Sequence, residues 1–195
     1  MTAVDDRIEM AETKGELTLD ELFEALERMP VPEGYKAEIV EGAVFMAPQR
    51  DNHWDIIADV FEQLRSKYPR GRLKSDVRID YPGHLNGFAS DVTLLAEHAE
   101  KNDRGRWRCQ DVVFVVEVVS RATAMNDYGP KKAAYAAAGV PVYLVVDPYT
   151  RKCVLHTVPK AETYTVEERT PFGHPVDLTA TPVGLALGTA EFPHE

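Results

Sequence analysis

The sequence predicts a single α/β domain built on a mixed β-sheet that is flanked by helices. Residues 111–120 (DVVFVVEVVS) and 142–146 (VYLVV) are apolar on both faces, as expected for central strands that are covered on both sides. Between them, the alanine-rich residues 130–139 predict a short helix, which completes a strand–helix–strand crossover. Residues 152–158 and 163–168 have the pattern of two amphipathic strands, which are expected to extend the sheet.

The chain before this crossover begins with a polar segment. Residues 1–17 predict an N-terminal tail, so the domain is expected over residues 18–195. The tetrapeptide Thr18-Leu-Asp-Glu21 has the pattern of a capping box at the start of a helix, which must end before Pro30.

A hairpin and a second helix are expected next. Residues 37–41 and 43–47 predict two short strands around Gly42. Asp51 can cap a helix through residues 53–68, where apolar residues recur at helical spacing.

Two further strands precede the crossover. Residues 73–81 and 88–95 predict strands, and the turn-rich residues 82–87 separate them. In the crossover helix, Pro130 suits the first turn and Gly139 suits the position just after the last one.

Composition narrows the class of protein. With 22 Lys and Arg against 32 Asp and Glu, the net charge of −10 argues against a long nucleic-acid interface. Local basic patches remain open at residues 65–74 and 101–108, although charge runs of this kind are usually solvated surface. Two isolated cysteines and six dispersed histidines argue against a disulfide framework and a zinc site, respectively. No apolar run approaches the roughly 20 residues of a membrane span, and the N-terminal residues do not have the pattern of a signal peptide, so we expect a cytoplasmic protein without a membrane segment.

Acidic residues interrupt strands that otherwise look buried. Glu38, Asp91 and Glu117 each have an ordinary structural explanation when taken singly, such as a hairpin face, a turn or a lysine partner. Pairing of neighbouring strands, however, would bring Asp91 and Glu117 within a few ångströms. Such a pair needs a shared proton or a divalent cation, and oxygen ligands favour Mg²⁺ or Mn²⁺. Lys131 or Lys132, on the first turn of the crossover helix, could place an ammonium nearby.

These residues resemble the PD-(D/E)XK nuclease superfamily, which has the restriction-endonuclease-like fold, and more closely a bacterial family of small proteins labelled putative restriction endonucleases. The resemblance covers roughly residues 18–170. The family pattern is found at Glu38–Gly42, Pro48, His53, Ser90–Val92, Glu117–Ser120, Asp127–Lys131, Tyr135, Gly139–Val140 and Tyr143–Pro148. Two positions depart from the superfamily pattern: Ser90 replaces a proline, and Val119 replaces the lysine expected two residues after Glu117.

The resemblance implies functional roles for several of the matching residues. It implies that Asp91, Glu117 and the Val118 carbonyl hold Mg²⁺ or Mn²⁺, with Glu38 as a further ligand or a support through water. It places the catalytic lysine on the following helix, at Lys131 rather than Lys132. His53 would contact substrate or orient Glu38, unless it is simply structural, and Tyr135 shares the face of Lys131 and is expected on the substrate side.

Three functions are consistent with these features. The first is a Mg²⁺-dependent endonuclease that hydrolyses DNA phosphodiester bonds. The alternatives are a catalytically silent scaffold for protein interaction and a metal-dependent hydrolase of a small phosphate ester. We expect a homodimer. The first places to look for its interface are the amphipathic strands predicted over residues 152–158 and 163–168 and the following residues 170–192, which are rich in exposed-looking apolar side chains.

Overall fold

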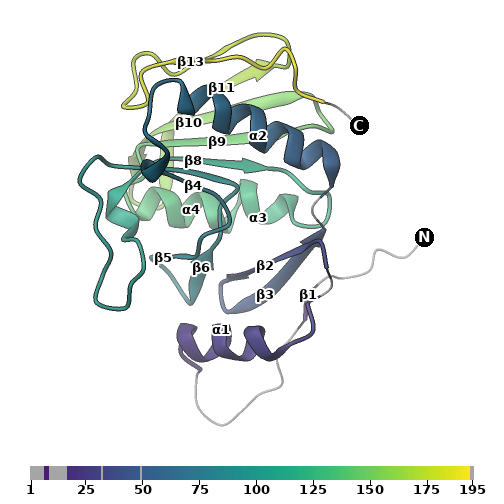
Figure 1. The fold of residues 1–195 in the computed structure, drawn as a ribbon, viewed down its shortest axis with the longest axis vertical. Helices are drawn as coiled ribbons and strands as arrows, with labels where there is room; N and C mark the ends of the chain where they lie inside the picture. The colour runs from purple at the N-terminus through teal and green to yellow at the C-terminus, as the bar shows by residue number, and fades with distance from the viewer. Residues whose placement is uncertain (1–6, 9–16, 32, 49, 194–195) are drawn as a thin grey trace.

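A six-stranded mixed sheet forms the centre of the structure, a computed structural model that describes residues 7–8, 17–31, 33–48 and 50–193 (Figure 1). Its strands, in spatial order, are β11 (Thr163–Pro171), β10 (Lys152–Lys160), β9 (Val142–Asp147), β8 (Val112–Val118), β7 (Val92–Leu95) and β4 (Leu73–Lys74). Strands β8 and β9 are parallel, and the other neighbours pair antiparallel. The predicted α/β class and the crossover between β8 and β9 are therefore confirmed.

A smaller sheet lies beside the first. It has the order β1 (Arg7–Ile8), β3 (Ala43–Pro48), β2 (Tyr35–Val40), β6 (Asn86–Phe88) and β5 (Ile79–Tyr81). The predicted hairpin is its β2–β3 pair. Helix α1 (Leu19–Arg28) packs Leu22 and Leu26 against Ile39 and Val44 of this hairpin. Its N-terminus carries the predicted capping box between Thr18 and Glu21.

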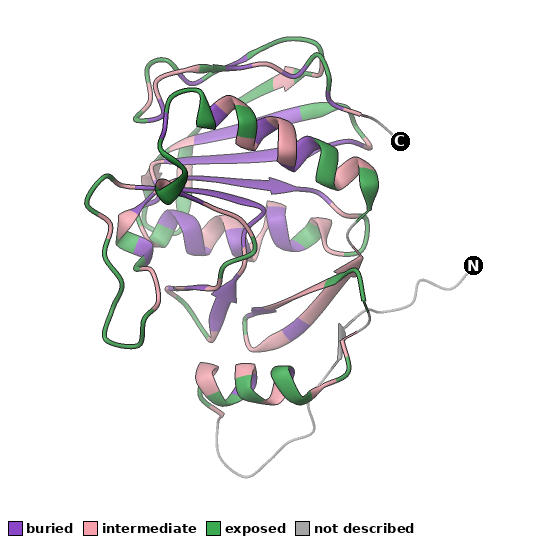
Figure 2. Cartoon of the chain, in the orientation of Figure 1, coloured by how far each residue is buried: buried purple, intermediate pink, exposed green. Residues whose placement is uncertain are grey.

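Helices cover the central sheet on both faces. The buried residues of α2 (Asp51–Arg65) pack against one face, as in Val60 with Val116 and Leu144. Helix α4 (Pro130–Ala137) packs on the other face together with the smaller sheet, and α3 (Ala124–Tyr128) precedes it. Figure 2 shows that the strands between these layers are almost wholly buried, which is why β8 and β9 can be apolar on both faces.

Two predicted strands are each divided between the sheets. The strand expected over residues 73–81 is instead β4 and β5, and the one expected over 88–95 is β6 and β7. Asp76 has a φ of 54°, a left-handed conformation that interrupts the first strand. Residues 89–91 carry the chain from the smaller sheet to the larger one, so Asp91 lies just before β7 rather than within a strand.

Smaller corrections concern the helix ends and the tail. Asp51 is the first residue of α2, not its cap; Arg50 takes the N-cap position and makes no side-chain cap, and the helix ends at Arg65. The N-terminal tail predicted for residues 1–17 lies mostly outside the described residues, although Arg7–Ile8 pair with β3 as strand β1.

The C-terminal segment completes the core. It contains β12 (Val176–Asp177) and β13 (Ala186–Leu187), and short 3-10 turns elsewhere occupy Arg70–Arg72 and Cys109–Asp111. Its apolar residues look exposed in the sequence but are buried in the core that α2 covers: Val176, Leu178, Val183, Leu187 and Phe192. They are therefore not available as a dimer surface. No helix in the described part of the chain is long and apolar enough to cross a membrane.

Candidate active site: a buried cluster of carboxylates and lysines

Four carboxylates from separate segments meet where the two sheets adjoin. Asp91, Glu117 and Asp127 are 2%, 2% and 4% exposed, and the Glu38 side chain is 14% exposed. Glu38 comes from β2, Asp91 from the link into β7, Glu117 from β8 and Asp127 from α3. An unpaired carboxylate in such surroundings is costly, so each of them needs a partner.

Strand register explains why Asp91 and Glu117 are neighbours. Val92 on β7 pairs with Val116 on β8, which sets the preceding Asp91 beside Glu117. Asp91 Oδ2 accepts a hydrogen bond of 2.7 Å from the Val118 backbone N–H, which fixes it against the end of β8. Glu38 Oε1 accepts one of 2.8 Å from the Ala89 N–H, in the link between the sheets. The predicted proximity of Asp91 and Glu117 is therefore confirmed.

Lys131 joins three of the carboxylates. Its Nζ lies 2.7 Å from Glu117 Oε1, 3.0 Å from Glu38 Oε2 and 3.2 Å from Asp127 Oδ1. Asp127 is four residues earlier in the chain, so the break between α3 and α4 still leaves the two side chains adjacent. Lys132 instead lines a separate pocket with His156 and Glu167. Of the two candidate lysines, only Lys131 is in the cluster.

A second lysine, Lys36, was not foreseen. Its Nζ lies 2.8 Å from Asp91 Oδ1, 3.8 Å from Glu38 Oε1 and 4.0 Å from Glu117 Oε2. Lys36 and Glu38 are two residues apart on β2 and therefore project from the same face. Because Glu38 was already a candidate site residue, this two-residue spacing could have predicted that Lys36 lies in the cluster as well.

Asp127 was also given no role, although it belongs to the family pattern. Burial raises its pKa to about 7 in spite of the neighbouring Lys131 ammonium. Burial likewise raises the pKa of Glu117 against the opposing effect of Lys131 and Lys36. By contrast, burial alone would raise the pKa of Asp91, but Lys36 beside it lowers that pKa far below the usual range. The cluster thus contains four carboxyl groups and two ammonium groups, and burial favours the protonated form of Glu117 and Asp127.

Both ammonium groups are held in the charged state. Burial alone would lower the pKa of Lys131, but the surrounding carboxylates, Glu117 foremost, raise it well above its usual range. Burial acts on Lys36 in the same way, and Asp91 and the other carboxylates raise its pKa instead.

Tyr135 and His53 each lie against one carboxylate of the cluster. Tyr135 is completely buried; its hydroxyl donates to Glu117 Oε1 and lies 2.9 Å from Ser90 Oγ. Tyr135 therefore contacts Glu117 directly and can orient its carboxylate, and the substrate contact expected of Tyr135 stays a prediction. His53 Nε2 lies 3.2 Å from Asp91 Oδ2, without hydrogen-bond geometry.

A pocket of about 220 Å³ leads from solvent to His53. It lies beyond the carboxyl ends of β8 and β9, where ligands of α/β sheets commonly bind. Arg50, Arg121 and Tyr149 contribute to its lining, and the Arg121 guanidinium lies 4.7 Å from the centre of the Tyr149 ring.

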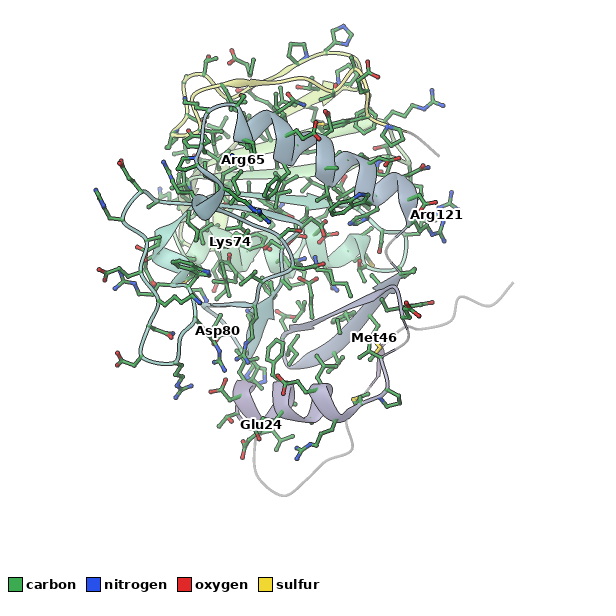
Figure 3. All side chains as sticks on the ribbon, viewed as in Figure 1. Glu24, Met46, Arg65, Lys74, Asp80 and Arg121 are labelled. Carbon is green, nitrogen blue, oxygen red and sulfur yellow. The ribbon has the colours of Figure 1, made fainter. Side chains whose placement is uncertain are left out.

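The two basic segments noted in the sequence are engaged elsewhere. In residues 65–74, Arg65 donates to the Tyr68 carbonyl, and Lys74 packs over the Trp107 ring. In residues 101–108, the arginines form ion pairs with acidic side chains, as Arg106 does with Asp20 and Asp80. Figure 3 shows Arg65 and Lys74 on the opposite side of the view from Arg121.

Within the described residues, no group of three or more Asp, Glu, His or Cys side chains is arranged so that it could hold a metal ion as it stands. Lysine ammonium groups instead lie against these carboxylates, with Lys36 Nζ 2.8 Å from Asp91 Oδ1 and Lys131 Nζ 2.7 Å from Glu117 Oε1. The donors are nevertheless all carboxylate oxygens, the set that Mg²⁺ and Mn²⁺ prefer.

Comparison with known proteins places this cluster in a family. Residues 22–190, which include every member of the cluster, match the sequence profile of the Uma2 family, described as "Putative restriction endonuclease". The chain belongs to the Uma2 family. Its fold is similar to the crystal structure of a putative nuclease belonging to DUF820 from Anabaena variabilis, with a TM-score of 0.68 and 14% sequence identity over 91% of this chain and 97% of that one. No curated protein matches the sequence.

Membership in Uma2 agrees with the resemblance drawn from the sequence pattern and supports a nuclease. At 14% identity, the structural similarity shows a shared fold and no more.

Proposed function

We propose that this Uma2 protein is a metal-dependent endonuclease that hydrolyses DNA phosphodiester bonds. The observation that carries the proposal is the excess of buried carboxylate beside a solvent pocket, with Asp127 and Glu117 both shifted toward higher pKa. A protein that only needed a stable core at this position would do better with apolar residues.

The donor set fits Mg²⁺ or Mn²⁺. Asp91, Glu117 and Glu38 are the residues that would hold the ion, because their carboxylates converge from three segments. A bound divalent ion lowers the pKa of a coordinated water and offsets charge on the phosphate.

The side chains of the chain itself supply positioning and charge. Lys131 remains protonated, so its role is to stabilise negative charge on the phosphate rather than to accept a proton. Tyr135 orients Glu117 by its hydrogen bond. In the pocket, Arg121 is suited to a phosphate of the substrate backbone, and His53 lies between that pocket and Asp91.

The test is cleavage of plasmid DNA with Mg²⁺ or Mn²⁺ by the wild type, Glu117→Gln and the matched control Glu97→Gln, which alters an exposed glutamate. We expect Glu117→Gln to lose activity by on the order of 10²–10³-fold or more and Glu97→Gln to retain it. Equal cleavage by the two variants would exclude the cluster as the site. Arg121→Ala should weaken DNA binding without affecting the metal.

A small phosphate ester is the second candidate substrate. The modest pocket volume and the ion pairs that occupy the basic segments both favour it over a long duplex. A chromogenic phosphodiester assayed beside plasmid and single-stranded DNA distinguishes the two, since hydrolysis of the small ester alone would favour this alternative. Cleavage of both DNA strands would agree with the predicted homodimer, which sedimentation tests directly.

A further inference from the structure

Lys36 lies where several carboxylates converge. Three of them are in the cluster, at 2.8 Å (Asp91 Oδ1), 3.8 Å (Glu38 Oε1) and 4.0 Å (Glu117 Oε2) from its Nζ. These are the same three side chains that would hold a divalent ion. The ammonium is thus in the position where a cation is most stabilised by them.

We propose that the Lys36 ammonium occupies the metal position as a resident cation, and that Mg²⁺ or Mn²⁺ binds by displacing it toward Asp76 at the rim. The proposal rests on the proposed function, because it concerns the metal that this function requires.

The two cations exclude each other for geometric and electrostatic reasons. A divalent ion requires carboxylate oxygens at roughly 2.0–2.6 Å, which is closer than any of the three oxygens now lies to the Lys36 Nζ. An ammonium left among the same oxygens would be a few ångströms from the ion, in surroundings that screen poorly. Lys36 is able to leave because its side chain has a flexible four-carbon stem and is 10% exposed.

Asp76 offers a partner for the displaced side chain. Its Oδ1 is already 3.6 Å from Lys36 Nζ, and its side chain is 46% exposed. The Asp76 backbone N–H donates to the Ser90 carbonyl at 3.1 Å, which holds it next to the Asp91 segment. A rotation of Lys36 away from Asp91 therefore exchanges a buried ion pair for one at the surface.

Lys131 provides the contrast within the cluster. It also contacts Glu38 and Glu117, but through the other oxygen of each carboxylate, and it is tied to Asp127 at 3.2 Å. At 2% exposure it has no path to solvent comparable with that of Lys36. Lys131 should stay in place when the metal binds.

The first test uses the wild-type protein and the metal alone. Lysines are acetylated briefly with a succinimidyl ester, with and without saturating Mn²⁺, and the modified positions are quantified by mass spectrometry. We expect acetylation of Lys36 to increase several-fold with Mn²⁺, while Lys131 stays protected and the partly exposed Lys132 is unchanged. Unchanged or reduced acetylation of Lys36 at saturating Mn²⁺ would overturn the proposal.

The second test measures Mn²⁺ affinity by calorimetry in matched variants. Lys36→Met keeps the stem and removes the competing charge, so we expect its Mn²⁺ affinity to rise by on the order of tenfold or more. Lys131→Met should gain less because Lys36 still competes, and Lys132→Met should remain within about twofold of the wild type. Asp76→Asn should bind about two- to fivefold more weakly because it removes a surface ion pair from the displaced state.

The outcomes separate this proposal from the proposed function. If the wild type binds Mn²⁺ but Lys36→Met binds no more tightly, displacement is wrong while the metal site stands. If neither the wild type nor any variant binds Mn²⁺, the metal-dependent function fails and the displacement fails with it. Should Lys36→Met not fold, the acetylation of the wild type decides.

Discussion

Consecutive residues of β8 face two different interiors. Val116 and Glu117 are adjacent in the chain and nearly equally buried, at 0% and 2% exposed. Val116 faces the apolar core beneath α2, with Phe114 and Val118 of the same strand. Glu117 faces α4, where Lys131 and Tyr135 contact its carboxylate.

The comparison shows two ways of filling a buried position. Beneath α2, any side chains of suitable size and shape that exclude water contribute to stability. Beside α4, each carboxylate depends on particular partners, so one lost group leaves a buried charge without compensation. A chain retains the second arrangement at a cost in stability, which points to a chemical role.

The largest expected effect on stability comes from placing a carboxylate on the apolar face of β8. Val116→Glu places a carboxylate in the apolar core that also contains Val60 and Leu144. We expect a loss of several kcal/mol, enough to abolish cooperative folding in urea. The control is Val166→Glu on β11, where the side chain is 38% exposed and the expected change is within about 0.5 kcal/mol. A stable Val116→Glu protein would mean that the apolar core admits water.

The next largest effect comes from removing an ammonium from the charged interior. Lys131→Met should lower the free energy of unfolding in the absence of metal by about 3–5 kcal/mol because Glu117, Glu38 and Asp127 lose a shared partner. Lys132→Met, one position along the same helix, should change it by less than about 0.5 kcal/mol. Equal losses in the two variants would show that helix propensity or general charge, not the cluster, is responsible.

The sequence predicted the two interiors unequally. Apolar periodicity identified both central strands and the crossover, since these features are local and each follows from a short segment. Asp91 and Glu117 were expected to be close because consecutive strands usually pair, and the register confirms it.

Other features depended on long-range packing that local patterns do not contain. Residues 73–95 change sheets twice, and nothing in strand propensity distinguishes one long strand from two that pair with different partners. Lys36 and Asp127 enter the cluster only because β2 and α3 are brought against β8. The burial of the apolar residues near the C-terminus was not predicted for the same reason. They lie in a segment with many turn residues, and only the packing of this segment against the core shows that they are buried.

Protonation of Asp127 gives the charged interior a pH dependence that the apolar one lacks. Its pKa is raised to about 7 from an ordinary value of 3.8, so between these values the folded protein binds more protons than the unfolded chain. Wild-type stability attributable to this group therefore falls as pH rises from about 4 to about 7 and then levels off. Asp127→Asn removes that loss.

Asp127→Asn should therefore become more stable relative to the wild type between pH 5 and pH 8. The gain is a few kcal/mol at most, at about 1.4 kcal/mol per pKa unit. Urea unfolding at several pH values measures it, with the exposed Asp103→Asn as the control for charge alone. A difference that stays constant with pH would show that Asp127 is ionised throughout the folded state.

The smallest expected effect comes from removing one hydroxyl group, and it distinguishes a role in stability from a role in activity. Tyr135→Phe deletes the hydroxyl that donates to Glu117, which should cost about 1.5–3 kcal/mol because the acceptor is charged. Tyr164→Phe deletes a hydroxyl that donates to the Val140 carbonyl at 2.9 Å and should cost about 1 kcal/mol. Only Tyr135→Phe should also lower kcat for phosphodiester hydrolysis, since Glu117 loses its orientation while the pocket is intact. If both variants keep full activity, Lys131 alone is sufficient to hold Glu117, and the hydroxyl of Tyr135 serves the fold rather than the chemistry.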